Sequence, residues 1–214
     1  MTQTTTFWWV RHAPVIGFDG RRYGALDVDC DTSDAPAFQA LAALLPARAI
    51  LVTSALRRAI RTASALEHAG FRAVERHEDA ALGEQSFGEW QGQPTDAVAR
   101  AAATAGATHR HWIVDPEYTP PGGESFRALE ARVMRSARSL LHRFRGQTLV
   151  VVSHGGPIRA ACMHGEGWSL ERALALTIRN LSVTRIDGRI EAPDRDVWQV
   201  RWTGRLGTDH GQVA

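Results

Sequence analysis

Two short apolar stretches of this sequence each run directly into a histidine. Phe7–Val10 is followed by Arg11 and His12, and Thr148–Val152 is followed by a serine and His154. Short runs rich in aromatic and β-branched residues predict buried strands. Because the carboxyl ends of neighbouring parallel strands meet at one edge of a sheet, we expect the two histidines to lie close together.

The rest of the chain alternates between strand-like and helix-like patterns. Further strands are predicted at residues 49–53, 72–76 and 197–202. Helices are predicted at 34–45 (capped by Ser33), 54–68 (capped by Ser54), 95–105, 124–144 and from Pro157 onward. Asp187-Gly188 indicates a hairpin. The alternation predicts an α/β fold, with a mostly parallel central sheet and helices on both faces.

The length of 214 residues fits one domain, spanning 1–214. Residues 80–123 are rich in glycine and proline and predict a lid-like excursion from the core. Loops held by a rigid scaffold often carry function, so we expect this excursion to contribute to a site. Residues 204–214 predict a loose tail.

All 25 basic residues are arginine, and lysine is absent. This excludes P-loop enzymes, protein kinases and Schiff-base enzymes, which require a lysine. The formal charge of +2 gives no argument for nucleic acid binding. We expect a cytoplasmic protein, because the two cysteines form no disulfide framework and neither a signal peptide nor a membrane span is evident.

The segment from Thr53 to Thr62 follows the second predicted strand and contains Arg57, Arg58 and Arg61. A helix that begins here points its free N–H groups at the same edge of the sheet as the histidines. Helix N-termini and guanidinium groups both bind phosphate oxygens. A basic helix face in contact with solvent is the alternative interpretation.

Five segments together resemble, in order, the motifs of the histidine phosphatase superfamily, which has the phosphoglycerate-mutase-like fold. Residues 10–13 (VRHA) are similar to its RHG signature, and 51–62 (LVTSALRRAIRT) to SPLxRxxQT. Residues 82–92 (LGEQSFGEWQG) are similar to LxExxFGxWEG. Residues 121–125 (PGGES) and 150–159 (VVVSHGGPIR) are similar to PGGES and VVSHGGxIR. The resemblance implies a three-layer sandwich.

The resemblance also implies a catalytic set. His12 is the expected nucleophile and forms a phosphohistidine, which requires a neutral imidazole. Arg11 and Arg58 supply positive charge around the phosphoryl oxygens. His154 is expected to donate to a phosphoryl oxygen. Glu84 is expected to protonate the leaving alkoxide and later to deprotonate water.

Other residues are expected to bind the substrate. Gly155 allows close backbone approach, and Arg21 or Arg22 helps to hold the substrate. Glu124 and Ser125 either contact the substrate or hold the loop. No metal or cofactor is needed, because the arginines neutralise the charge.

The sequence departs from the family motifs at several positions. Ala13 replaces a glycine and either crowds the turn beside the nucleophile or narrows the pocket; Ala55 replaces a proline. Arg61 replaces a glutamine and is expected to lie on the surface. The family commonly has an asparagine soon after RHG, whereas the only asparagine here is Asn180. Phosphate contact by that side chain is therefore missing or replaced.

We therefore expect a metal-independent phosphomonoesterase that acts on a small phosphorylated metabolite, as a monomer or homodimer. Residues 20–29 (GRRYGALDVD) resemble the alpha-ribazole phosphatase branch, so alpha-ribazole 5'-phosphate is one candidate substrate. Phosphoglycerate mutase-type transfer is the alternative within the family. A non-catalytic phosphate-binding module is a second alternative.

Other phosphatase and hydrolase classes fit less well. Asp27, Asp29 and Asp31 follow a glycine-rich loop and not a buried strand, so an aspartate nucleophile of the haloacid dehalogenase type is disfavoured. A cysteine phosphatase needs Cys-x5-Arg, which neither cysteine satisfies, and the Gly-x-Ser-x-Gly elbow of serine hydrolases is absent.

Overall fold

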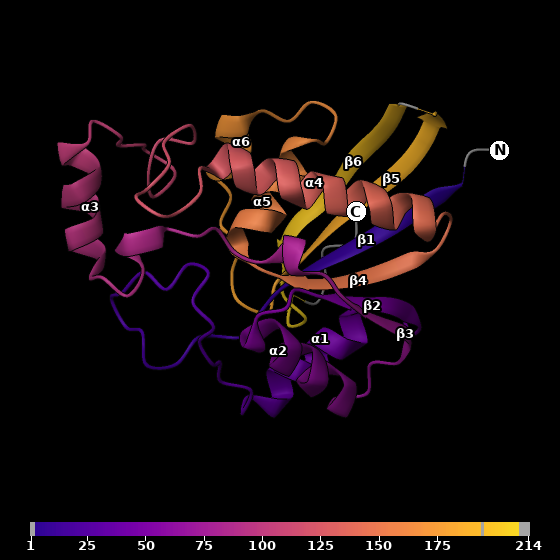
Figure 1. Cartoon of the computed structure of the whole chain (residues 1–214). Helices are drawn as coiled ribbons and strands as arrows, with labels where there is room; N and C mark the ends of the chain where they lie inside the picture. The colour runs from indigo at the N-terminus through magenta and orange to yellow at the C-terminus, as the bar shows by residue number, and fades with distance from the viewer. Residues whose placement is uncertain (1–2, 194, 210–214) are drawn as a thin grey trace.

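The part of the chain that the computed structural model describes, residues 3–193 and 195–209, contains one sheet of six strands. They are β1 (Thr4–Arg11), β2 (Ala49–Thr53), β3 (Ala73–Glu78), β4 (Thr148–Ser153), β5 (Val183–Ala192) and β6 (Arg195–Arg205), in the spatial order β3-β2-β4-β1-β5-β6. The first four run parallel, whereas β5 is antiparallel to β1 and β6 to β5. The predicted α/β fold with a mostly parallel sheet is confirmed (Figure 1).

Helices cover both faces of this sheet. α1 (Ala35–Leu44) and α2 (Arg57–His68) lie on one face. α4 (Phe126–Arg143), α5 (Gly155–Met163) and the short α6 (Leu170–Leu174) lie on the other (Figure 1). The sequence patterns predicted all of these helices except α6.

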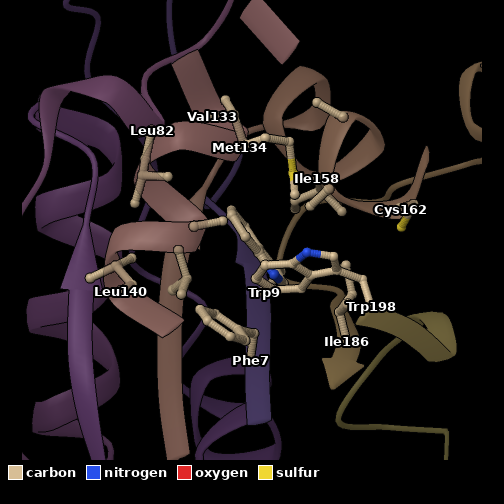
Figure 2. Close-up of a cluster of buried hydrophobic side chains, with 14 of the residues drawn as sticks. Phe7, Trp9, Leu82, Val133, Met134, Leu140, Ile158, Cys162, Ile186 and Trp198 are labelled. Carbon is tan, nitrogen blue, oxygen red and sulfur yellow. The ribbon is translucent and has the colours of Figure 1, made fainter. Parts of the chain in front are cut away.

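The alternation of side chains along β1 creates the two apolar layers. Phe7 and Trp9 belong to the buried cluster that α4 and α5 cover, which also contains Val133 of α4 (Figure 2). Val10 is buried on the opposite face, in the cluster that contains Phe38 of α1. Successive side chains of a strand point to opposite faces, so one short run of residues supports both layers. Each fully buried large side chain contributes about 1.5–3 kcal/mol.

Two of the predicted helix caps are wrong. Asp34, and not Ser33, caps α1, because its side chain accepts a hydrogen bond from the Ala37 amide. α2 begins only at Arg57, and Ser54 lies before it with a different partner. Ser125 caps α4 by accepting from the Ala128 amide at 3.1 Å.

The predicted hairpin at Asp187-Gly188 is also wrong, because both residues lie inside β5. The indole of Trp198 packs against Gly188 and lies 2.9 Å from the position a Cβ would take. This glycine therefore makes room for a ring on the neighbouring strand and does not form a turn. β6 runs to Arg205, so the first two residues of the predicted tail belong to the sheet. Residues 210–214 of that tail lie outside the described residues.

The segment between β3 and α4 extends away from the sheet, as Figure 1 shows for α3 (Thr95–Thr104). The 13–32 loop is bonded to it through the backbone. The Arg22 amide donates to the Gln93 carbonyl (3.0 Å), and the Gly92 amide donates to the Arg22 carbonyl (2.6 Å). The two irregular segments of the chain therefore form one joined structure beside the sheet. Among the described residues, no helix is long and apolar enough to cross a membrane.

Candidate active site

The pairing of β1 with β4 brings the two histidines together. Arg11 lies opposite Ser153 in the register, so His12 and His154 both follow directly at the carboxyl edge of the sheet. Their ring centroids are 5.0 Å apart, and both side chains are fully buried. The expected proximity of these residues is thus a consequence of strand register.

His12 is held in one tautomer. Its Nδ1 lies 2.6 Å from the carbonyl oxygen of Ala13, which can only accept, so Nδ1 carries the proton. Nε2 is buried and has no hydrogen-bond partner among the described residues. Burial, and then the charges of Arg58 and Arg11, hold the pKa of His12 well below 6.5. The ring is therefore neutral, with a free lone pair on Nε2.

The backbone around His12 is fixed from two other parts of the chain. Asn180 donates to the His12 carbonyl oxygen at 2.7 Å, and the Ala13 amide donates to the hydroxyl of Thr62 at 2.9 Å. The only asparagine of the chain thus positions the backbone of His12. The methyl group of Ala13 is buried in the apolar cluster beneath α1 and α2, and its φ angle is not positive. The backbone conformation at position 13 therefore does not require the glycine that the family motif has there.

Arg58 is fully buried next to both histidines. Its guanidinium donates to Nδ1 of His154 (3.1 Å) and to the carbonyl oxygens of Leu26 (2.6 Å) and Gly24 (2.8 Å). These bonds engage three of its five N–H groups and leave one on each terminal nitrogen. Arg58 is thus a preorganised cation that retains donors for an anion.

Both ring nitrogens of His154 have protein partners. Since Arg58 donates to Nδ1, the proton of His154 is on Nε2, which donates to the hydroxyl of Ser54 at 2.7 Å. Burial, followed by the charge of Arg58, keeps the pKa of His154 well below 6.5. In this arrangement His154 offers no free N–H to a phosphoryl oxygen, in contrast to the expectation from the sequence.

A cavity of about 470 Å³ opens beside this buried group. Its wall is formed by Arg11, Arg21, Arg22, Tyr23, Glu84, Phe87, Arg110, His111, Trp112, Ile113, Gly155 and Arg159. Arg11, Arg21, Arg22, Glu84 and Gly155 were predicted from the sequence. His12, Arg58 and His154 lie behind the wall, where the ring of Tyr23 packs 6.4 Å from His12 and 5.1 Å from the guanidinium carbon of Arg58.

The side chain of Glu84, which comes from the excursion, reaches the N-terminus of α5. Its carboxylate accepts from the amides of Gly156 (3.1 Å) and Gln85 (3.0 Å). A Cβ on Gly156 would lie 2.3 Å from this carboxylate, so a side chain there would displace Glu84. The second glycine of the His-Gly-Gly segment therefore makes space for the carboxylate in the cavity wall.

Glu124, Ser125 and Arg61 have partners outside the cavity. Glu124 accepts from Arg132 at 2.7 Å and from the Ser86 amide at 3.0 Å, which fixes the loop that carries Glu84. Ser125 caps α4, as described above. Glu124 and Ser125 thus stabilise the local backbone, whereas the sequence left open whether they do this or contact the substrate. Arg61 forms an ion pair with Asp29 and is half exposed, as expected for a surface residue.

Trp112 and Arg159 also belong to the site, although neither was predicted there from the sequence. Trp112 comes from the excursion, donates to the side-chain oxygen of buried Gln85 at 2.9 Å, and packs edge-on against Phe126. The guanidinium of Arg159 lies over its ring at 5.0 Å. Arg159 ends the segment 150–159 that resembles VVSHGGxIR, and it follows Gly155 by four residues in α5, so the motif and the helical spacing both pointed to it.

Within residues 3–193 and 195–209, no three His, Cys, Asp or Glu side chains are grouped so that they could hold a metal ion. The chemistry of the site is that of a neutral imidazole, several guanidinium groups and one carboxylate. These groups can bind an anion, attack an electrophilic centre and exchange a proton with a leaving group.

Comparison with known proteins identifies relatives of this chain. A family model described as the histidine phosphatase superfamily, branch 1, matches residues 7–201. The bifunctional protein Rv2228c of Mycobacterium tuberculosis is 39% identical over 111 residues, which are 52% of this chain but only 29% of that protein. A 2,3-bisphosphoglycerate-dependent phosphoglycerate mutase of a Methylobacterium species is 37% identical over 126 residues, 57% of this chain and 59% of the mutase.

Solved structures share the whole fold. One, described as mycobacterial hydrolase 2, is 26% identical and has a TM-score of 0.78. The match covers 100% of this chain and 94% of that chain. A putative alpha-ribazole-5'-P phosphatase from Escherichia coli is 22% identical with a TM-score of 0.73, over 94% of this chain and 96% of that one. At this identity the second likeness concerns the fold.

Proposed function

The chain belongs to branch 1 of the histidine phosphatase superfamily, and from this we propose that it is a phosphomonoesterase that acts through a phosphohistidine at His12. The observation that carries the proposal is the state of His12: a neutral ring whose Nε2 lone pair has no protein partner. Such a nitrogen is ready to attack phosphorus.

The reaction proceeds in two displacements. Nε2 of His12 forms a bond to phosphorus while the ester P–O bond breaks, and Glu84 gives its proton to the leaving alkoxide. Glu84 then takes a proton from water, whose oxygen attacks the phosphohistidine and releases phosphate and the free imidazole. Glu84 lines the cavity, which supports this role.

Arg11 and Arg58 stabilise the negative charge that spreads over the transferring phosphoryl group. Arg58 is buried beside His12, and Arg11 lines the cavity. His154 fixes the orientation of Arg58 through its Nδ1.

The substrate is a small phosphorylated metabolite, in keeping with a cavity of about 470 Å³. Alpha-ribazole 5'-phosphate is one candidate, supported by the resemblance of residues 20–29 and by a fold shared with a putative phosphatase of that class. Mutase-type transfer is the alternative, supported by the phosphoglycerate mutase relative. Two buried free cysteines agree with a reducing, cytoplasmic environment.

The test is hydrolysis of p-nitrophenyl phosphate in excess EDTA by wild-type protein, by His12→Ala and by the control His68→Ala, whose ring is exposed on α2. We expect EDTA-resistant activity in the wild type and the control, and its loss in His12→Ala. A base-stable, acid-labile phosphoenzyme should form only when His12 is present. Activity that survives without His12, or that EDTA abolishes, contradicts the proposal.

The two alternatives give different results. A mutase transfers the phosphoryl group between metabolites and releases little inorganic phosphate. A non-catalytic module binds inorganic phosphate with His12 intact but forms no phosphoenzyme with any of the phosphate esters tested.

A further inference from the structure

Arg22 lies in the cavity wall, partly buried, without a protein partner for its guanidinium. Its Nε atom is buried and unpaired, and within residues 3–193 and 195–209 its side chain makes no hydrogen bond or ion pair. Burial lowers the pKa of this guanidinium, although an arginine remains charged. A partly buried cation without a counter-ion is unfavourable. This suggests that the missing partner arrives with the ligand.

The other arginines of the wall differ from Arg22, because each has a protein partner. Arg11 donates to the Ile178 carbonyl oxygen, Arg21 to that of Gly92, and Arg159 to that of Leu176. Arg110 pairs with Glu171 of α6. Local contacts thus account for the positions of these four, and they leave Arg22 unexplained.

The backbone of Arg22 is held rigidly. Its amide donates to Gln93 and its carbonyl accepts from Gly92, so the residue is fixed between the 13–32 loop and the excursion. Its side chain also borders a second hollow of about 230 Å³ beside α3, which shares Trp112 and Ile113 with the main cavity. Arg22 is therefore placed where a ligand that extends past the phosphoryl group would reach it.

The charges of the cavity exceed what one phosphoryl group needs. Five arginines line the wall, and Glu84 is its one carboxylate. The proposed transfer uses Arg11 from the wall and Arg58 behind it. Arg22 is left over, and guanidinium groups bind carboxylates and phosphates through paired hydrogen bonds.

We propose that the substrate carries a second anionic group, a carboxylate or a second phosphate, and that Arg22 binds this group. The proposal rests on the phosphomonoesterase function and names the class of its substrate. Arg22 is then a specificity-determining residue that takes no part in the transfer of the phosphoryl group.

The experiment compares kcat/KM for substrates that differ in the second group. Glycerol 3-phosphate and 3-phosphoglycerate differ by a carboxylate; 1,3-propanediol monophosphate and bisphosphate differ by a phosphate. p-Nitrophenyl phosphate has no second anion and reports the basal reaction. The proteins are wild type, Arg22→Gln, Arg22→Lys and Arg100→Gln, the last an exposed arginine of α3 that pairs with Asp96 outside the cavity.

In at least one pair, we expect wild type to prefer the member that carries the second anionic group by about tenfold or more in kcat/KM. This is the usual effect of one hydrogen bond to a charged group. Arg22→Gln should bring that ratio close to one while activity on p-nitrophenyl phosphate changes less than about threefold. Arg22→Lys should retain part of the preference, because it keeps the charge without the fork. Arg100→Gln should behave as wild type. The preferred pair identifies a carboxylate or a phosphate.

Three results overturn the proposal. They are equal rates on both members of each pair in wild type, a preference that survives in Arg22→Gln, and a proportional loss of all activities in Arg22→Gln. In each case, His12-dependent activity on p-nitrophenyl phosphate in the wild type leaves the phosphomonoesterase function standing, so failure of the two proposals can be told apart.

Discussion

The guanidinium of Arg58 donates through Nε to Nδ1 of His154, 3.1 Å away. Because an arginine can only donate, this bond sets the tautomer of His154 and directs its proton to Ser54. Ser54, His154 and Arg58 thus form a buried chain of hydrogen bonds that ends at the cation beside His12. The orientation of Arg58 thus depends on the hydroxyl of Ser54, a buried residue that does not line the cavity.

Replacing Ser54 with alanine leaves the Nε2–H of His154 without an acceptor in a fully buried position. We expect Ser54→Ala to lower the unfolding free energy by about 1–3 kcal/mol and kcat by about tenfold. Urea denaturation and steady-state kinetics measure the two effects. Ser64→Ala is the control, because Ser64 is exposed on α2 and bonds only to a carbonyl of its own helix. Equal behaviour of the two variants would contradict the hydrogen-bond chain.

The low pKa of His12 predicts the acid side of the pH profile. The nucleophile must be neutral, and burial together with Arg58 and Arg11 keeps its pKa well below 6.5. In wild type, kcat/KM should therefore not fall through protonation of His12 between pH 7.5 and 6.5, the ordinary histidine value. Arg58→Gln removes one cause of the shift and should move the acid limb to higher pH. A wild-type midpoint at or above 6.5 would be evidence against a preorganised neutral nucleophile.

The same two histidines predict a dependence of stability on pH. Both remain neutral in the folded protein below 6.5, whereas the unfolded chain binds protons there. Stability should thus be constant with respect to these groups above about pH 7 and fall as the pH drops below about 6.5. Each histidine contributes a slope of up to about 1.4 kcal/mol per pH unit. Denaturation of His154→Gln at pH 7 and pH 5.5 should show a smaller difference than that of wild type.

The contact between Gly156 and Glu84 predicts a selective defect. A methyl group at Gly156 would lie 2.3 Å from the carboxylate and must displace it. We expect Gly156→Ala and Glu84→Gln to lose about a hundredfold in kcat/KM on alkyl phosphates, within the usual range for a general acid. Both should lose far less in kcat/KM on p-nitrophenyl phosphate, because its leaving group needs no proton and kcat/KM reports formation of the phosphohistidine, before Glu84 acts on water. A uniform loss on both kinds of substrate would point to general disruption of the site.

The bond between Trp112 and Gln85 predicts that the excursion influences the same carboxylate. Gln85 is buried, its side-chain oxygen accepts from Trp112, and its backbone amide donates to the carboxylate of Glu84. Trp112→Phe keeps a ring between Arg159 and Phe126 but removes the bond to Gln85. We expect a loss of about threefold to tenfold in kcat/KM for alkyl phosphates, with little change in kcat/KM for p-nitrophenyl phosphate. Rates across leaving groups of different basicity measure this, and a change confined to KM would indicate substrate binding alone.

The residues at strand ends were predictable because motif and periodicity fix them locally. His12, His154 and Arg58 follow apolar strands or begin a helix after one, and a parallel sheet brings such positions to one edge. Glu84 was found only through its family motif, since nothing in its local pattern distinguishes it from another loop carboxylate.

The remaining cavity residues depend on tertiary packing that local patterns do not record. Trp112, Arg110 and His111 lie in an irregular segment whose position follows from contacts with α6, Gln85 and Phe126. The sequence around Ser54 is typical of a helix cap, yet its hydroxyl accepts a hydrogen bond from buried His154. Asp187-Gly188 carries the signal of a turn, yet the indole of Trp198 required the glycine within a strand.

The backbone bonds between the 13–32 loop and the excursion define the unit that an engineer would have to exchange. Arg22, Gly92 and Gln93 join the two segments, and Thr95 donates to the Gly20 carbonyl at 2.7 Å. Replacing the excursion alone with that of a homologue would break these bonds, because the 13–32 loop would then face a segment of different sequence. Chimeras that move both segments together should keep the sheet and its histidines and acquire the substrate range of the donor.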